Sequence, residues 1–382
     1  MDHRQRQILA SGAILGMFLV IQLGALALVE PFLEGGLQGS QDTTNPGISI
    51  AYIAGILVAT VAMLGVIKYG GQNVLRLVII FAGVYVTFFV FDALVPALGS
   101  VGGVFIADAV ALVVALGLGA ALYLYPEWYV IDAAGVIMGI GAAGLFGINF
   151  GILPALVLLT ALAVYDAISV YGTEHMLTLA SGMMEMRVPV VFVVPLYRSY
   201  SFLDESTPET IADDSAEDLD AAADETDLPT DPEDIDAATL NDLGPDRVSD
   251  IDDDLLAEAD LGDDELDRLD DDVKDAISGG KRDALFIGLG DAVIPSVLVA
   301  SAAFFIETGP TLSVLGISAT LPAVTAMVGT LVGLTVLLWL VHQGRAHAGL
   351  PLLNGGTIAG YLIGALLSGL TLVEALGLDS FL

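Results

Sequence analysis

The apolar residues of this chain are gathered into long runs that short polar segments separate. Nine of these runs hold roughly twenty residues or more, and a helix of about 20 residues, rising ~1.5 Å per residue, spans the ~30 Å hydrocarbon core of a bilayer. The runs cover residues 7–32, 49–68, 74–98, 103–125, 128–150, 152–180, 283–306, 321–342 and 350–372. This pattern predicts an all-α, polytopic membrane protein with nine transmembrane spans.

A long acidic segment interrupts the pattern between the sixth and seventh runs. From Asp204 to Asp275 it holds 31 Asp or Glu, three Lys or Arg and no aromatic residue. Such a composition cannot bury a core and predicts a disordered loop. The chain is therefore expected to comprise spans one to six within residues 1–198, an acidic loop over 199–282, and spans seven to nine within 283–382.

Composition narrows the class of protein further. Hydrophobic residues make up 55% of the chain and charged residues 15%, which excludes an ordinary soluble domain. The net charge of -35 disfavours nucleic acid and anionic surfaces as partners, and the absence of cysteine excludes disulfides, thiolate metal sites and a Cys nucleophile. The excess of Asp over Glu in the acidic segment suggests a halophilic archaeal source, with an ordinary acidic interaction tail as the alternative.

The basic residues predict the orientation, because Lys and Arg concentrate in cytoplasmic loops. Threading nine spans puts every Lys and Arg on one side, whereas the opposite loops at 33–47 and 307–320 carry acids but neither Lys nor Arg. The protein is therefore expected in the cell membrane, with its N-terminus and acidic loop in the cytoplasm and its C-terminus outside.

Ionisable residues inside the spans are the first candidates for chemistry, since each costs several kcal/mol to insert. Asp92 lies about 18 residues into the third span, or roughly 27 Å, at the outer interface. Asp108 and Asp132 lie within a turn or so of a span edge, where snorkelling and hydration reduce the cost. We expect these three acids to be interfacial.

Two other acids lie deeper, on consecutive antiparallel spans. Asp166 lies about 21 Å from the outer edge of its span, and Asp291 about 10 Å from the cytoplasmic edge of its own, which is nearly the same depth. Two carboxyls at close range cannot both ionise, so one can act as a base while the other keeps a proton, as in aspartic proteases. A transporter's proton or cation site, or two acids facing separate cavities, are the alternatives.

Short motifs surround both deep acids. Asp166 follows Tyr165, and Asp291 ends the sequence Gly-Leu-Gly-Asp that begins at Gly288. Each glycine lowers helix propensity by about 1 kcal/mol and removes a side chain that would block a substrate backbone.

These two motifs, on the sixth and seventh of nine spans with a long loop between them, resemble the GxGD intramembrane aspartyl proteases, the presenilin and signal peptide peptidase family. The resemblance implies an aspartic endopeptidase without metal or other cofactor, and a cytoplasmic loop that fits the presenilin-like archaeal branch. Its implied catalytic acids are Asp166 and Asp291. Its implied substrate-binding residues near these acids are Tyr165, Gly288, Leu289 and Gly290.

A third family motif, Pro-Ala-Leu at the start of the ninth span, is only partly matched. The residues there are Pro351, Leu352 and Leu353, which the resemblance also implies in substrate binding, with Leu352 in place of Ala. A literal Pro-Ala-Leu at 154–156 is a decoy, because it lies ~15 Å or more from the acids by helix rise.

Two other patterns predict local structure. Residues 188–194 are rich in β-branched side chains and favour a strand, which could hold an unwound substrate by β-augmentation; a buried connector is the alternative. Glycines four residues apart in the fifth, eighth and ninth spans predict close helix packing. They are Gly135, Gly139, Gly329, Gly333, Gly356, Gly360 and Gly364.

Together these features predict an intramembrane aspartyl protease that cleaves single-span membrane proteins within the lipid bilayer and has no nucleic-acid partner. A proton- or cation-coupled transporter or channel that uses the paired acids is the main alternative. A catalytically idle scaffold for other membrane proteins is a third reading.

Overall fold

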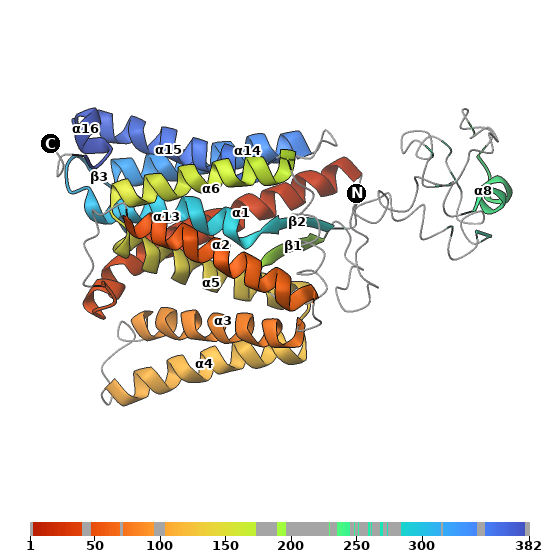
Figure 1. Ribbon diagram of the computed structural model, residues 1–382, viewed down its shortest axis with the longest axis horizontal. Coiled ribbons are helices and arrows are strands. Elements are labelled where there is room, and N and C mark those ends of the chain that lie inside the picture. Colours follow the sequence, from red (N-terminus) through yellow and green to blue (C-terminus); the bar gives the residue numbers. More distant parts are fainter. Residues whose placement is uncertain are drawn as a thin grey trace. The chain divides into compact units, whose positions relative to one another are not determined.

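The computed structural model describes residues 3–39, 47–68, 72–94, 104–172, 189–195, 235–244, 284–314, 316–341 and 348–378, with isolated positions between 229 and 273. Most of these residues are helical (Figure 1). The long helices are α1 (His3–Glu34), α2 (Gly47–Lys68), α3 (Gln72–Leu94), α4 (Val104–Leu124), α5 (Trp128–Asn149), α6 (Ile152–Gly172), α13 (Leu289–Phe305), α14 (Leu321–Val341) and α15 (Gly349–Leu367). The short elements are α8 (Ala237–Leu243), α16 (Leu372–Ala375), β1 (Val191–Pro195), β2 (Ala284–Gly288), β3 (Thr311–Val314) and β4 (Ile317–Thr320).

Six helices are long and apolar enough to cross a membrane, so a polytopic membrane protein is confirmed. In the described part of the chain they are Gln7–Glu34, Asn73–Leu94, Trp128–Asn149, Ile152–Val170, Leu321–Val341 and Gly349–Leu367. Shorter apolar stretches occupy α2, α4 and α13, at Ile53–Met63, Asp108–Leu124 and Leu289–Phe305. Nine spans therefore remain a prediction. The predicted orientation does too, since most of the Lys and Arg behind it lie outside the described residues.

The seventh predicted span is wrong at its beginning. Helix was expected from residue 283, but residues 284–288 form β2 and helix begins only at Leu289. The physical reason is the pair of glycines, Gly288 and Gly290, which weaken the helix where its first turn would have formed.

Strand β2 pairs with β1 (Val191–Pro195), so the strand predicted over 188–194 is confirmed for residues 191–194 and extends one residue further, to Pro195. The Leu289 N–H donates to the Val190 carbonyl across 2.8 Å. Because Val190 precedes β1 and Leu289 follows β2, the two strands run antiparallel. A second antiparallel pair, β3 with β4, was not predicted; its register joins Thr311 to Thr320 and Val314 to Ile317.

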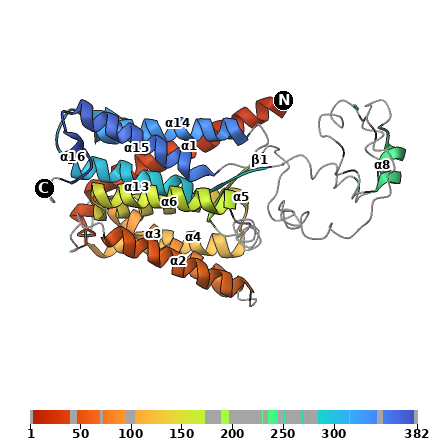
Figure 2. The ribbon, with the colours of Figure 1, turned by 45° about the horizontal axis from the view of Figure 1, so that its top comes forward.

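Within the helical unit, α13 is central and contacts α1, α5, α6, α14 and α15. Both views show α14 and α15 on one side of it and α3 and α4 on the other (Figures 1 and 2). Helices α14 and α15 approach so closely that a Cβ added at Gly329, Gly333, Gly356 or Gly360 would overlap the opposite backbone. The predicted glycine packing is confirmed for this pair.

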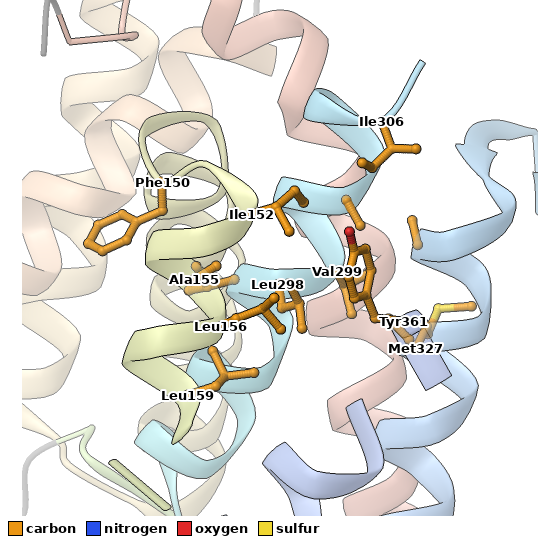
Figure 3. Packing of buried hydrophobic residues seen from close by; sticks show 14 of the residues in the cluster. Phe150, Ile152, Ala155, Leu156, Leu159, Leu298, Val299, Ile306, Met327 and Tyr361 are labelled. Atoms are coloured by element: carbon orange, nitrogen blue, oxygen red, sulfur yellow. The ribbon is translucent and has the colours of Figure 1, made fainter. Parts of the chain in front are cut away.

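A buried apolar cluster joins α6, α13, α14 and α15, the helices around the deep acids (Figure 3). Leu159, Leu298 and Tyr361 have no exposed surface. The Tyr361 hydroxyl, which needs a partner when buried, donates to the Ala375 carbonyl at 2.7 Å. This cluster holds α6 and α15 against α13 and so fixes the ends that carry the acids.

The acidic segment corrects one prediction. Its described residues bury seven apolar side chains together, so the statement that it cannot bury a core is wrong for them. They are Ile235, Ala237, Leu240, Val248, Ile251, Leu269 and Val273. These apolar residues are scattered among many acids, so the composition of the whole segment is strongly acidic and hides them. Most of the predicted loop at 199–282 lies outside the described residues, and its disorder remains a prediction.

Candidate active site

The structure brings the two deep acids together at the beginning of α15. Asp166 lies six residues before the end of α6 and is 5% exposed. Asp291 lies in the first turn of α13, is partly buried, and has its Oδ2 only 3.3 Å from the position that a Cβ on Gly349 would take. Both carboxyls therefore lie at the junction of α6, α13 and α15.

Asp166 caps α15 from a neighbouring helix. Its Oδ2 accepts the Leu350 N–H at 3.0 Å, and the Gly349 N–H also donates to this carboxyl. The N-cap residue of α15, Ala348, offers no side-chain bond. The first amides of a helix have no partner within it and form its positive end, so α15 supplies both donors and field to stabilise negative charge on Asp166.

Glycines surround Asp291. A Cβ added at Gly349 would lie 3.3 Å from Asp291 Oδ2, which is a tight contact, and one at Gly288 would lie 3.5 Å away. At Gly290 an added Cβ would meet only Ile294, at 3.9 Å. The glycines thus leave the backbone accessible beside the carboxyl, as the motif predicts.

The predicted depth of Asp291 was reached by counting residues as helical, and not all of them are. Counting seven residues of helix from Ala284 gave the depth of Asp291, but the first five of these residues form β2. A strand rises ~3.3 Å per residue rather than ~1.5 Å. The position of Asp291 is therefore set by the residue at which α13 begins, Leu289, and a count of helical residues from the edge of the span does not give its depth.

The residues aligned with the family's Pro-Ala-Leu motif shape the start of α15. Pro351 is its third residue, where a missing N–H leaves no helical bond unmade. Leu353 is fully buried, and the Leu352 carbonyl lies against Gly333 of α14 while the Leu352 side chain stays partly exposed. The side chains of these three residues are apolar and offer the acids no hydrogen bond. The backbone just before them does, because the Leu350 N–H donates to Asp166.

Sequence reasoning missed Gly349 and Leu350, because their function lies in backbone amides. A signal was present, since a glycine stands two residues before the proline of the motif. Tyr165 was predicted near substrate and lies on an open face of α6, 42% exposed between Val164 and Ile168. Its role in substrate binding remains a prediction.

The decoy motif and the three shallow acids lie away from this junction. Ala155 is buried in the apolar cluster. Asp92 of α3 and Asp108 of α4 lie close to each other. Asp132, expected near the edge of its span where hydration reduces the cost of a charge, accepts the Val193 N–H of β1 on its Oδ1 at 2.8 Å.

Comparison with known proteins identifies close similarity over nearly the whole chain. Residues 15–370 match the family model described as signal-peptide peptidase, presenilin aspartyl protease. One crystal form of a presenilin family intramembrane aspartate protease is 30% identical, with 94% of this chain and 99% of that chain covered and a TM-score of 0.54. A second crystal form is 31% identical, with 93% and 97% covered and a TM-score of 0.53. No match was found among curated proteins.

Proposed function

Because the chain belongs to the signal-peptide peptidase and presenilin aspartyl protease family and is an intramembrane aspartic endopeptidase, we propose that Asp166 and Asp291 are its catalytic pair. Their proposed substrates are single-span membrane proteins, cleaved within the bilayer. The observation that carries this proposal is the meeting of both carboxyls at the amino end of α15, where Gly349 and Leu350 donate to Asp166.

We propose different roles for the two acids, and the hydrogen bonds of Asp166 support this division. Two backbone donors and a helix amino end stabilise the Asp166 carboxylate. Asp291 lies beside the same helix end, next to Gly349, and in this proposal it keeps the proton that the pair shares. Asp166 is then the base and Asp291 the acid of the proposed reaction.

In the proposed reaction a water molecule attacks the scissile carbonyl carbon while Asp166 removes one of its protons. Asp291 donates its proton to the carbonyl oxygen, which gives a neutral tetrahedral diol. The C–N bond then breaks as Asp166 passes its proton to the leaving amine and Asp291 recovers one from the diol. Both acids return to their starting states, and one water is consumed.

The β1–β2 sheet suggests how a substrate helix is opened. Carbonyls in a helix are bonded within it, so a scissile segment must unwind and find other backbone partners. The Leu289 N–H bonds the carbonyl of Val190, the residue just before β1. Because strand residues alternate between edges, the amides of Phe286 and Gly288 point to the other edge of β2. We propose that substrate pairs with that edge, three residues before Asp291.

Two finer features belong to the same proposal. Nine spans are supported by a long helix for each predicted run in the described part of the chain. The distribution of Lys and Arg supports a cytoplasmic acidic segment and an external C-terminus, the arrangement expected of a presenilin-like archaeal member.

The test is cleavage of a detergent-solubilised single-span peptide by the purified protein, with products identified by mass. Wild type should give two defined products, and Asp166→Asn should give none. Ion flux in proteoliposomes without any cleavage would instead support a transporter that uses the paired acids.

A further inference from the structure

We infer that Asp132 of α5 is a positioning residue for the substrate strand: it occupies the outer edge of β1 and so directs an extended substrate to the edge of β2 beside Asp291. This inference rests on the proposed function, because it concerns where that substrate binds. The sequence alone gave Asp132 no such role.

The first observation is the bond from strand to helix. Asp132 is partly buried, and its Oδ1 accepts the Val193 N–H at 2.8 Å. The Val190 carbonyl points to β2, where it bonds the Leu289 N–H. Backbone groups alternate along a strand, so those of Phe192 also point to β2 and the Val193 N–H points away from it. The Asp132 carboxyl therefore lies on the edge of β1 that a third strand would otherwise use.

The second observation is that glycines on the same face of α5 pack against the β1–β2 sheet. Gly135 lies one turn after Asp132, and a Cβ added there would come 2.8 Å from Cε1 of the fully buried Phe192. At Gly139, one turn further, an added Cβ would lie 3.3 Å from Cδ1 of Leu289. The glycines predicted to pack helices thus also admit side chains from β1 and from the residue after β2.

These contacts leave the two edges of the sheet unequal. Alternation turns Val191, Val193 and Pro195 to the outer edge of β1; the Val193 N–H is bonded to Asp132, and Pro195 has no N–H, so Val191 alone keeps an amide there for another strand. On the outer edge of β2, Phe286 and Gly288 present amides just before the Gly290–Asp291 turn. Fixing β1 to α5 sets the place and register of that second edge relative to Asp291.

The decisive variants separate the hydrogen bond from the charge. Asp132→Ala removes the acceptor and should lower kcat/KM about tenfold, the net worth of such a bond, and should add products cut at neighbouring peptide bonds. Asp132→Asn keeps an oxygen at the same place and should restore both the rate and the single cleavage position. Asp108→Ala is the matched control, because it removes a membrane carboxyl that does not touch the sheet.

The same bond can be removed from the strand. Val193→Pro deletes the donor and should reproduce the Asp132→Ala products, and combining the two changes should cost little more than either alone. Val191→Pro places the same ring in β1 without deleting that donor and should disturb the cleavage position less. If Asp132→Ala reduces the folded yield, the Val193→Pro variant still decides the question.

Hydrogen exchange keeps the inference testable without cleavage. Added peptide should protect residues 284–288 of wild type and of Asp132→Asn, and this protection should be lost in Asp132→Ala. Equal protection in all three, wild-type products from Asp132→Ala, or equal damage from Asn and Ala would each overturn the inference. An inactive wild type that still shows the expected exchange pattern would sink the proposed chemistry and leave the positioning role standing.

Discussion

Changing Gly349 to Ala tests whether the close fit around Asp291 controls catalysis. An added Cβ would lie 3.3 Å from Asp291 Oδ2 and 3.4 Å from Leu337 Cδ2. Both contacts are short, so the carboxyl or the start of α15 must move by a few tenths of an ångström. The change leaves both proposed catalytic carboxyls, and the two amides that bond Asp166, chemically intact.

The size of the effect follows from that displacement. A misplacement of ~1 Å at a reacting group can cost about 10²-fold in rate, so a few tenths should lower kcat about three- to tenfold. Stability should move the other way or not at all, because Ala in place of Gly within a helix gains up to about 1 kcal/mol. A slower enzyme that unfolds no more easily is the expected signature.

Gly355 provides the matched control on the same helix. It is exposed, and a Cβ added there meets nothing within 4 Å, so Gly355→Ala should gain helix propensity without touching the site. Initial rates of peptide cleavage and thermal unfolding in detergent would be measured for both variants. If Gly349→Ala cleaves as fast as Gly355→Ala, the geometry at Asp291 does not limit the reaction.

Three further predictions follow from the paired acids and the acidic segment. Asp166→Asn and Asp291→Asn should each abolish cleavage, and the double variant should cost little more, because the acids act as one unit; Asp108→Asn should stay active in the same mass assay. The cleavage rate should fall at low pH, when both carboxyls are protonated, and at high pH, when both are ionised; a flat profile would contradict a shared proton. Replacing residues 199–280 by a short flexible linker should leave cleavage intact, whereas a folded but inactive variant would show that this segment takes part.

The features that could be predicted from the sequence are the membrane helices, which apolar residues indicate, and the two deep acids, which are charged residues inside such helices. Long apolar runs indicate membrane helices because nothing else in a protein needs them. Asp166 and Asp291 were identified because an acid at that depth is costly enough to require a function. The structure contains the long apolar helices and places both acids at the start of α15, and the catalytic function of the two acids is our proposal.

The features that were missed depend on backbone or on distant partners. The apolar run from residue 283 predicts helix over 284–288, because a short apolar run has no period that separates a strand from a buried helix. The bond from Val193 to Asp132 joins residues 61 positions apart, and no local pattern reports such a pairing. The amides of Gly349 and Leu350 have no side-chain signature at all.

The start of α15 explains why a bulkier residue can replace Ala in the family motif. The backbone of this helix, not the side chain at 352, binds Asp166. Pro351 favours this arrangement, because a proline in the first turn keeps the helical φ and withholds only an amide that has no helical partner. Leu352 turns its carbonyl to Gly333, whose lack of a side chain lets α14 approach, while its own side chain stays partly exposed. Leu352→Ala should therefore alter which substrates are cleaved more than how fast the preferred one is cleaved, and a loss of cleavage for every peptide tested would place this side chain in the catalytic geometry instead.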